Sequence, residues 1–551
     1  MESLKFIAIS GTTKVTQNMY IYEYGQDIII VDCGVGFPEE VAFGVDLVIP
    51  DFSYVLKNRS RIRGILISHG HEDHFGALPF LLKDLDVPVY TGQLTAGFIK
   101  EKLFDHRVKA RINPIFPDAN TLTLGAFKID AFRVTHSVPD SLGFCITTPV
   151  GKFFHVSDYK FDWSPVDGKQ WDLAKAANLA KSGGVLALAS DSLGATSEGY
   201  TKSELDLEKT IDNIIQRATG RVFFTTISSN ISRMQQAMNS STRNGRKVTF
   251  IGRSIEQKID LANDLGYLKY NPGLVVSQRQ AERMQPNKIT FIVSGCYGQV
   301  GSALYKMAMG EHDSLAIGPG DVVIFSADPN PPGAEQTVNY VVDNLIETGA
   351  QVHYYDMQED LHVSGHGSEK EIEMLFALVR PKYFMPIGGT IRHMRAYKEL
   401  AKDMGFDPGN VFELTEGQVV DFVQGGARRG TTVPVREVLV DGLGIGDVGE
   451  VVLRDRKTLA QEGIVIVVVN FDKKERKIID KPDLISRGFV FAKTHQNLMD
   501  EGSRLITSEI ARGRGRRDGH FIREVVVETL ERFFFEKTHR RPMIMPVVVE
   551  V

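Results

Sequence analysis

The stretch that decides the fold is SHGHEDHFGAL, residues 68–78. It places His69, His71, Asp73 and His74 within six positions, although the whole chain contains only 14 histidines. A strand-like run, GILIS, precedes the cluster and a helix-like run, GALPFLLKDL, follows it, so the donors lie on a strand-to-helix turn. Imidazole and carboxylate are ligands that zinc accepts, and such groups need partners when they are buried. The H-x-H-x-D-H spacing therefore predicts a metal site rather than a solvated polar turn.

Three further donors stand at the ends of predicted strands. They are Asp32 in IIIVDCG, His136 in FRVTHSVPDS and Asp158 in FFHVSDYK. A single aspartate at the end of a strand is usually a turn former. Because these donors accompany the histidine cluster in this order, we expect them to complete the metal site, with Asp158 placed to bridge two ions.

Composition limits the class of protein. A chain of 551 residues predicts two to four domains. The net charge of -5 excludes a uniformly basic nucleic-acid binder but not a local basic groove. The three cysteines are far apart and form no CxxC, which is typical of a reducing cytosol and indicates neither a disulfide framework nor a thiolate zinc site. No signal peptide or membrane-length apolar run is visible, so we expect a cytoplasmic protein without a membrane partner.

The pattern of apolar and polar residues changes along the chain. Short apolar runs fill the first third, and helix-like and strand-like runs then alternate from about 200 to 350, which predicts an α/β domain with a parallel sheet. The first of these helices is predicted to start behind Thr201, with Glu204 three residues later as a capping partner. Residues 444–449 fit G-x-G-x-x-G, but the next residues, EVVLRD, read as a strand, which favours a linker turn over a dinucleotide site. The C-terminal residues read as a strand, an irregular stretch, a helix and a final strand.

The ordered donors match the sequence motifs of the metallo-β-lactamase fold, and the chain more closely resembles the ribonuclease J family of the β-CASP branch. The resemblance runs through NMYIYEYGQDIIIVDCG, SHGHEDHFGALPFLLK, SDYKFDWSPVDGK, SDSLGATSEGYT, HVSGHGS and the terminal RRPMIMPVVVEV. It implies an α/β fold class, namely a metallo-β-lactamase αββα sandwich with an inserted β-CASP α/β domain and a small C-terminal α+β domain. The implied domains are residues 1–205 and 349–430 for the metallo-β-lactamase domain, 206–348 for the β-CASP domain, 431–464 for a linker and 465–551 for a C-terminal domain used in oligomerisation.

The resemblance also implies roles for single residues. His69, His71 and His136 would hold one zinc ion, Asp73 and His74 a second, Asp158 would bridge them, and Asp32 would orient a ligand from behind. The implied catalytic residues are Asp73, His74, Asp158, Asp191 and His366, of which His366 would contact the phosphate that is cut. The implied pocket for a nucleotide phosphate comprises Ser229, Asn230, His362, Ser364, Gly365 and His366. Asp46 and Asp441 resemble a distal structural metal site of the family.

The implied activity is that of a zinc-dependent ribonuclease, a 5′-to-3′ exoribonuclease with endoribonuclease activity as an addition, in RNA processing and decay. Two zinc ions are expected, with manganese or magnesium as the alternative, and they would activate water for attack on a phosphodiester. The implied partners are single-stranded RNA with a 5′-monophosphate, further copies of the chain in a dimer or tetramer, and a paralogous chain.

The sequence departs from the family at positions around the second ion and the substrate. MPIGGTIRHM has Gly388 where the family has the histidine that completes the second site, Thr390 where it has glutamate, and His393 five residues further on. Ser232 replaces a usual histidine and Ser157 a usual glycine. Two alternatives follow: an active nuclease with a weakened second metal site, or a degenerate paralogue that serves as a structural or regulatory partner of an active copy.

A different substrate class is a third alternative, since related motifs also serve lactam, thioester and glyoxalase-type hydrolases and fold alone does not decide function. The long insertion between 195 and 350 favours nucleic acid.

Overall fold

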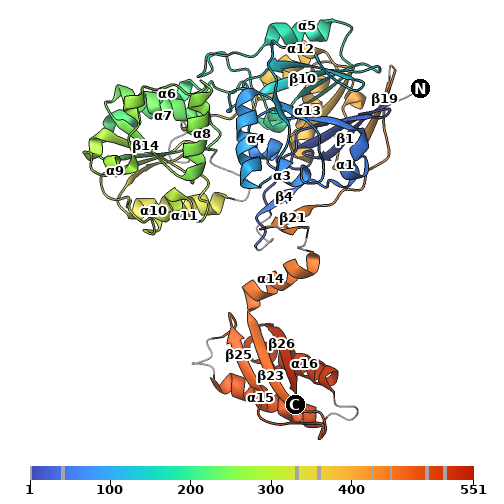
Figure 1. Ribbon diagram of the computed structural model, residues 1–551, viewed down its shortest axis with the longest axis vertical. Coiled ribbons are helices and arrows are strands. Elements are labelled where there is room, and N and C mark those ends of the chain that lie inside the picture. The colour runs from blue at the N-terminus through green and yellow to red at the C-terminus, as the bar shows by residue number, and fades with distance from the viewer. Residues whose placement is uncertain are drawn as a thin grey trace. The chain divides into compact units, whose positions relative to one another are not determined.

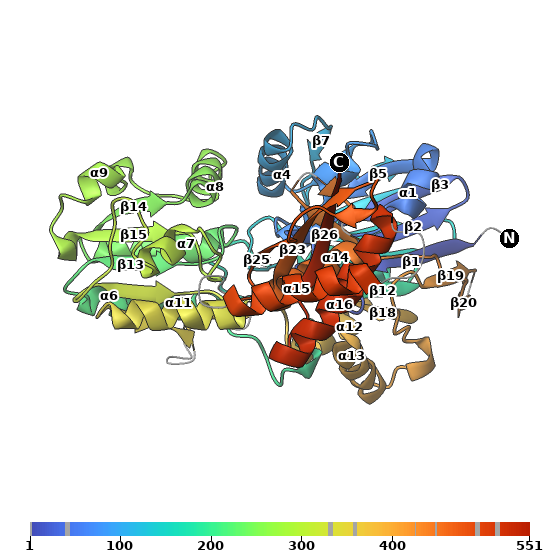
Figure 2. The same cartoon turned by 90° about the horizontal axis from the view of Figure 1, so that it is seen from below.

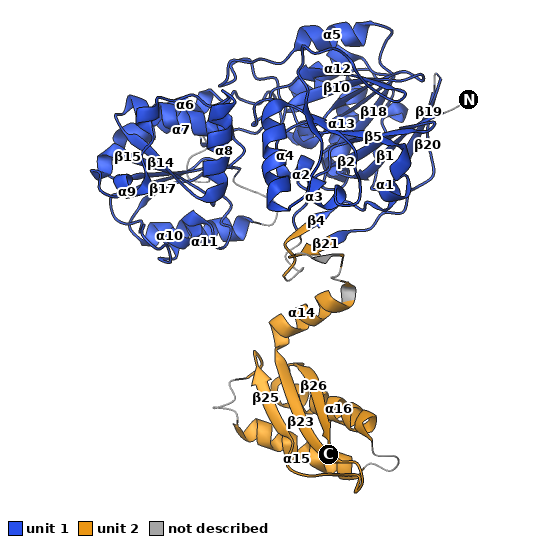
Figure 3. Cartoon of the chain, in the orientation of Figure 1, with its two compact units in different colours: residues 1–37, 48–438 blue, residues 38–47, 439–551 orange. Residues whose placement is uncertain are grey.

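The chain forms two compact units, residues 1–37 with 48–438 and residues 38–47 with 439–551 (Figure 3). The computed structural model describes residues 3–38, 44–328, 334–355, 361–424, 426–442, 444–446, 449–490, 496–512 and 518–551. The finer domain boundaries inferred from the sequence stay predictions.

Two sheets form a sandwich in the first unit. The first sheet has the strand order β20-β19-β1-β2-β3-β5-β6-β7 and the second the order β18-β12-β11-β10-β9-β8. The strands of the first sheet are β1 (Leu4–Ser10), β2 (Met19–Tyr24), β3 (Asp27–Val31), β5 (Ile62–Leu66), β6 (Val89–Thr91), β7 (Ile112–Pro114), β19 (Val419–Val423) and β20 (Gly426–Arg429). Those of the second are β8 (Leu122–Leu124), β9 (Phe127–Arg133), β10 (Leu142–Thr147), β11 (Lys152–Val156), β12 (Ala187–Asp191) and β18 (Tyr383–Ile387).

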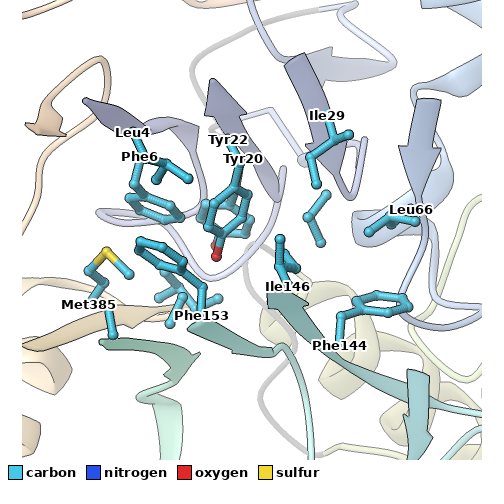
Figure 4. Packing of buried hydrophobic residues seen from close by; sticks show 14 of the residues in the cluster. Leu4, Phe6, Tyr20, Tyr22, Ile29, Leu66, Phe144, Ile146, Phe153 and Met385 are labelled. Carbon is cyan, nitrogen blue, oxygen red and sulfur yellow. The ribbon is translucent and has the colours of Figure 1, made fainter. Parts of the chain in front are cut away.

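A core of alternating apolar side chains joins the two sheets. Phe6 and Tyr22 from the first sheet face Phe153 and Met385 from the second (Figure 4). The outer face of the second sheet packs on helices through a separate core that includes Trp171, Ile372 and Phe376. The helices of this lobe are α1 (Ser53–Lys57), α2 (Glu72–Phe75), α3 (Leu78–Leu81), α4 (Gln93–Asp105), α5 (Leu173–Lys181), α12 (Glu369–Val379) and α13 (Ile391–Asp403). Helices therefore cover a pair of packed sheets, which is the αββα arrangement expected from the sequence.

An inserted lobe with a parallel sheet lies beside the sandwich in both views of the molecule (Figures 1 and 2). Its strand order is β14-β15-β13-β16-β17, and every neighbouring pair is parallel. The strands are β13 (Val222–Thr225), β14 (Lys247–Ile251), β15 (Ile289–Val293), β16 (Val322–Phe325) and β17 (Gln351–His353). The helices are α6 (Asp206–Arg217), α7 (Ile231–Arg243), α8 (Arg253–Asp264), α9 (Gln278–Ala281), α10 (Ala303–Ala308) and α11 (Glu335–Glu347). The parallel α/β domain predicted from alternating helices and strands is confirmed.

The predicted start of helix α6 is wrong. The helix begins at Asp206 behind Leu205, so Thr201 is not its cap. The hydroxyl of Thr201 instead donates to the carbonyl of His366. Glu204 is buried and pairs with Lys160 and Arg233 rather than with the start of a helix. A tertiary ion pair has overridden a local capping pattern.

The second unit is a small α+β structure. Its sheet has β23 (Ile464–Asp472) in the centre, β25 (Asp483–Arg487) and β24 (Lys477–Ile478) antiparallel to it, and β26 (Met543–Glu550) parallel to it. Helices α15 (Gln496–Arg512) and α16 (Gly519–Thr538) cover one face through a core that contains Val467, Ile506 and Phe534.

Two predictions for the C-terminal region are wrong. Residues that read as a strand after the glycine-rich pattern form helix α14 (Glu450–Glu462), and the stretch that read as irregular contains α15. Positions 447 and 448 of the glycine pattern lie outside the described residues. The remaining short elements are β4 (Leu47–Ile49), β21 (Val438–Asp441) and β22 (Gly444–Ile445). No helix in the described part of the chain is both long and apolar enough to cross a membrane.

Candidate metal centre

The polar residues at the strand ends meet at one edge of the sandwich. Asp32 follows β3, and the histidine cluster follows the parallel neighbour β5. In the second sheet β11, β12 and β18 run parallel, so their carboxyl ends lie side by side and bring Asp158, Asp191 and Gly388 together. The arrangement follows from strand direction, because the carboxyl ends of parallel strands share one sheet edge.

Three imidazole rings converge in the first group. His71 Nδ1 lies 3.0 Å from His69 Nε2 and 3.1 Å from His136 Nε2. Asp158 Oδ2 lies 3.6 Å from His69 Nε2 and 3.7 Å from His136 Nε2. The structure thus brings together the four residues that the sequence pattern assigned to a first ion.

Hydrogen bonds behind the rings fix their orientation. The carbonyl of Gly365 accepts from His136 Nδ1 at 2.6 Å, so Nε2 of that ring carries no proton in the neutral form. His71 Nε2 lies 3.0 Å from the hydroxyl of Ser137, and His69 Nδ1 lies 2.9 Å from that of Ser68. Each ring is held by a hydrogen bond at one nitrogen and points its other nitrogen toward the neighbouring rings, as histidines that bind a metal do.

Asp73, His74 and Asp158 form a second group. His74 Nε2 lies 3.5 Å from Asp73 Oδ2 and 3.3 Å from Asp158 Oδ2. On the other side of the ring, His74 Nδ1 donates to Asp32 Oδ2 at 2.8 Å. Asp32 is fully buried and also accepts from Ser68 and Ser157. Asp32 therefore lies behind His74 and fixes its tautomer, in the place that the sequence analysis expected.

Asp191 and His366 stand next to Asp158. His366 Nδ1 lies 2.6 Å from Asp191 Oδ2, and its Nε2 lies 3.9 Å from Asp158 Oδ2. Within the described residues, Asp158, Asp191 and His366 make up a third group whose ligand atoms all lie within 4.8 Å of one another.

The histidines of the site differ in pKa. Burial lowers the pKa of His71 to about 4 and those of His69 and His136 well below the usual value. Burial also opposes a charge on His366, but the carboxylates of Asp191 and Asp158 outweigh it and raise its pKa to about 9. Three rings with available lone pairs thus stand beside His366, which is positively charged at neutral pH.

The donor set fits a divalent metal. Neutral imidazoles and carboxylates are ligands for zinc and other borderline ions, and lone pairs about 3 Å apart with no proton between them repel one another unless a cation lies among them. Burial opposes a charge on His74, yet Asp158, Asp73 and Asp32 raise its pKa well above the usual value. The second group therefore attracts positive charge as well.

The residues assigned to a phosphate pocket lie around the loop that carries His366. Ser364 is exposed, and its hydroxyl accepts from the backbone N–H of His366 at 3.0 Å. His362 Nδ1 is buried and has no hydrogen-bond partner among the residues that the structure describes. Asn230 caps helix α7 by accepting from Arg233 N–H, and Ser229 directly precedes it. Ser232 and His136 line a small cavity of about 20 Å³.

Asp46 and Asp441 have separate partners in the structure. Asp46 accepts from the backbone of Gly442, whereas Asp441 pairs with the guanidinium of Arg456. Neither residue belongs to a potential metal group among the residues that the structure describes. A distal metal at this pair stays a prediction.

Sequence reasoning missed several residues that shape the site. Ser68 and Ser137 fix the rings of His69 and His71. Only Ser68 gave a local signal, because it directly precedes His69, whereas Ser137 follows His136 and not the ring that it holds. Lys160 and Arg233 are fully buried cations that share Glu204. A lysine four residues after a buried strand, in SDYK, gave only a weak hint of that role.

Four family models together match most of the chain. They are the metallo-beta-lactamase superfamily over residues 12–211, the ribonuclease J beta-CASP domain over 219–345, the Zn-dependent metallo-hydrolase RNA specificity domain over 352–411 and the ribonuclease J C-terminal domain over 451–551. A solved protein of unknown function from Enterococcus faecalis V583 shares the fold, with a TM-score of 0.54 at 14% identity over 76% of this chain and 100% of its own.

Full-length relatives agree with these matches. Ribonuclease J2 of Bacillus subtilis is 35% identical, covering 100% of this chain and 99% of its own length. Ribonuclease J 1 of Streptococcus pyogenes is 36% identical (98% and 97%), and ribonuclease J of Thermus thermophilus is 36% identical (100% and 96%). The resemblance read from the motifs is confirmed, and the chain belongs to the ribonuclease J family.

Proposed function

We propose that this chain, a metal-dependent hydrolase that acts on RNA, shortens single-stranded RNA from a 5′-monophosphate end with zinc ions as cofactors. The observation that carries the proposal is the convergence of His69, His71 and His136 on Asp158, with Asp73 and His74 alongside. Manganese or magnesium is the alternative ion, and cleavage inside the RNA chain is a further part of the proposal. A cytoplasmic location is also proposed.

Two sets of side chains would hold the two metal ions. His69, His71, His136 and Asp158 would hold the first ion, and Asp73, His74 and Asp158 the second. When bound, such ions make water nucleophilic at neutral pH and stabilise charge on phosphate oxygens. Asp32 keeps His74 in the tautomer that a ligand needs, because its carboxylate accepts the Nδ1 proton.

The proposed reaction is hydrolysis at the first internucleotide linkage. Water adds to phosphorus, the bond from phosphorus to the 3′ oxygen breaks, and the released 3′ oxygen takes up a proton. A nucleoside 5′-monophosphate leaves, and the shortened RNA again begins with a 5′-phosphate. His366 is charged because of Asp191 and would contact the phosphate that is cut, where its positive charge favours the dianionic transition state. Ser229, Asn230, His362, Ser364 and Gly365 would bind the terminal phosphate.

Association of two or four chains through the C-terminal unit is a further part of the proposal. The outer face of its sheet carries Ile485, Ile466 and Met545 in register across three strands, and Val468 and Val547 form the next pair. Met545, Val547 and Val549 are exposed. A contiguous apolar face of this kind is typical of a protein interface, and we propose a second copy of the chain as its occupant.

A weakly active partner of a catalytic paralogue is the second candidate function. Gly388 leaves the second group without the histidine that the family places there. In Streptococcus pyogenes two relatives coexist, ribonuclease J 1 and ribonuclease J 2, which are 36% and 35% identical to this chain. A purified chain that binds RNA but does not digest it at saturating metal would favour this candidate, and digestion under those conditions would favour the active nuclease.

The test replaces Asp73 and His74 with alanine and follows the digestion of 5′-monophosphorylated RNA. Loss of two donors from one ion should lower the rate by more than about a hundredfold. The control carries alanine at Asp86 and His106, an aspartate and a histidine outside the three candidate metal groups, and should keep the wild-type rate. Undiminished digestion by the Asp73/His74 variant would remove both residues from the mechanism.

A further inference from the structure

Gly388 leaves an open space beside two carboxylates of the site. Its φ of +68° places the backbone in the left-handed region. Among the described residues, and apart from its chain neighbours, a Cβ built on Gly388 would meet two atoms within 4 Å, Asp191 Oδ1 at 3.4 Å and Asp158 Oδ1 at 3.9 Å. The backbone N–H of Gly388 donates to the carbonyl of Gly11 at 2.8 Å, which fixes this conformation. The space therefore results from a missing side chain rather than from a displaced strand.

Three neighbouring side chains could occupy the position, namely Asn18, His393 and Asp191, but each already binds another partner. Asn18 turns its amide nitrogen, not its oxygen, toward His74 Nε2 at 3.2 Å, because its oxygen accepts from the hydroxyl of Tyr20 at 2.7 Å. His393 caps helix α13, since its Nδ1 accepts from the backbone N–H of Thr390 at 3.1 Å. An amide N–H₂ has no lone pair to offer, and a ring used as a cap cannot turn away without exposing the helix end.

Both carboxylate oxygens of Asp191 also have hydrogen-bond partners. Its Oδ2 pairs with His366 Nδ1 at 2.6 Å, and its Oδ1 accepts from the backbone N–H of Leu193 at 2.8 Å. In the described part of the chain the second metal group is therefore limited to Asp73, His74 and Asp158. Three protein donors leave at least one position open on a tetrahedral ion.

The charge around the space decides what can enter it. Carboxylate oxygens of Asp158 and Asp191 face it, so they attract a cation and oppose a phosphate, although His366 beside Asp191 offsets part of that repulsion. A phosphate oxygen therefore approaches more readily when an ion is present, and an ion that lacks a ligand gains one when the phosphate arrives. Each binding event favours the other.

Building on the proposed function, we propose that a phosphate oxygen of the RNA takes the ligand position that Gly388 leaves open, so that the second ion and the RNA bind cooperatively. In this chain the second ion is bound firmly only in the complex with RNA, while the first ion is held by protein side chains alone. By linkage, the factor by which RNA tightens the ion equals the factor by which the ion tightens RNA.

The experiment titrates the metal-free full-length protein with Mn²⁺ and follows free Mn²⁺ by its electron paramagnetic resonance signal. Titrations are made with and without a 5′-monophosphorylated oligoribonucleotide with cleavage-resistant phosphorothioate linkages. Gly388→His restores an imidazole at the open position. Gly388→Ala is the matched control, because it imposes the same strain at φ of +68° without adding a ligand.

For the wild-type protein we expect one firmly bound ion and a second that binds at least about tenfold more weakly, with RNA tightening the second by at least about tenfold. Gly388→Ala should behave in the same way. Gly388→His should bind two ions without RNA and lose most of the effect of RNA.

Two equally tight ions in the wild-type protein without RNA would overturn the inference. So would a second ion whose affinity RNA does not change, or a Gly388→His variant that matches Gly388→Ala. The wild-type titrations alone decide the coupling if a variant fails to fold. RNA binding, measured by fluorescence anisotropy, and digestion of unmodified RNA separate the two proposals. Loss of both contradicts the proposed function, whereas intact binding and digestion with an uncoupled second ion contradict only this inference.

Discussion

At the residue scale, Asp32 shows how a single buried carboxylate sets the chemistry of a neighbour. It accepts hydrogen bonds from Ser68, Ser157 and His74, and its φ of +61° is unusual for a residue other than glycine. Asparagine and aspartate tolerate the left-handed region better than most residues, because their short polar side chains bond locally. Ser157 donates to the same oxygen of Asp32 as His74 and competes with it there.

The substitution Asp32→Asn tests that arrangement. It keeps the shape and the backbone conformation but removes the charge that holds the Nδ1 proton of His74. We expect the affinity for the more weakly bound ion to fall by about 10- to 100-fold, measured by isothermal calorimetry.

A matched substitution provides the control for Asp32→Asn. Asp140 is also left-handed, at φ +75°, and its carboxylate accepts from the backbone of Leu94. Asp140→Asn should leave both metal affinities unchanged. Equal losses in the two variants would contradict the role given to the contact between Asp32 and His74.

The candidate ligands were accessible to sequence reasoning because their spacing is local and their chemistry is restrictive. The donors of the histidine cluster fall within six consecutive positions, His69 to His74. Each of the other three, Asp32, His136 and Asp158, comes shortly after the end of a strand that the sequence pattern predicts. The orienting partners were not accessible in the same way. Whether a serine such as Ser137 lies near His71 depends on how two loops meet, and 66 residues separate them in the chain.

At the scale of elements, a buried ionic network joins the inserted lobe to the loop that carries His366. Glu204 lies between Lys160, at 3.3 Å, and Arg233, at 2.6 Å. Lys160 also donates to the carbonyl of Ser364, and Arg233 to that of Leu361, so the two cations hold both ends of one short stretch of that loop. The next carbonyl, that of Gly365, orients His136. The network thus connects helix α7 with a metal-facing ring.

Removal of the shared anion should be costly. In Glu204→Gln, the buried Arg233 loses its ion pair with Glu204 and the buried Lys160 keeps only the longer one with Asp162, at 3.9 Å. We therefore expect a loss of about 3–5 kcal/mol in the free energy of unfolding, measured with denaturant. Glu208→Gln, in helix α6 directly after Glu204, is the control. Glu208 pairs with Arg243 near the surface, where such pairs contribute about 0–1 kcal/mol. Similar losses in both variants would contradict the role given to the buried network.

The same network predicts an acid dependence of stability. Burial alone raises the pKa of Glu204, but Arg233 and Lys160 outweigh it and hold the pKa at about 2. A carboxylate whose pKa is depressed on folding contributes stability above its unfolded pKa of about 4.3 and loses that contribution as the pH falls through the folded value. Between about pH 4.3 and 2, thermal unfolding of the wild-type protein should therefore become easier more steeply than that of Glu204→Gln. Parallel curves would contradict this assignment.

Element type was easier to predict than element boundaries. The parallel strands β13, β15 and β16 are continuous apolar runs, which the burial of both sheet faces requires. The start of α6 was misplaced because Glu204 has a stronger partner in the tertiary structure than a helix end. Helix α14 was missed because EVVLRD has the composition of a strand and its helical period emerges only over the following residues.

At the scale of the whole molecule, the C-terminal unit carries a sheet with unequal faces. Strand β23 alternates strictly, with Val465, Val467 and Val469 buried on the helix-covered side. The opposite face of the sheet shows Met545 and Val547 to solvent. Helices cover only one side, so the other side is where we expect a second copy of the chain to pack.

The double substitution Met545→Lys and Val547→Lys places two charges on that face. We expect it to lower the molar mass in solution, measured by light scattering, because burying unpaired charges opposes association. Ile346→Lys, an equally drastic change at an exposed position of α11, should leave the mass unchanged. An unaltered mass for the double variant, or a wild-type protein that is already monomeric, would contradict the proposed interface.

The central claim for the molecule is that a divalent ion binds where His69, His71 and His136 meet Asp158. Anomalous X-ray diffraction at the absorption edges of zinc and manganese, from crystals grown with each ion, tests it most directly. The account predicts a strong peak among these four side chains and a weaker one beside Asp73 and His74. An anomalous map with no peak among the three imidazoles, at either edge, would contradict it.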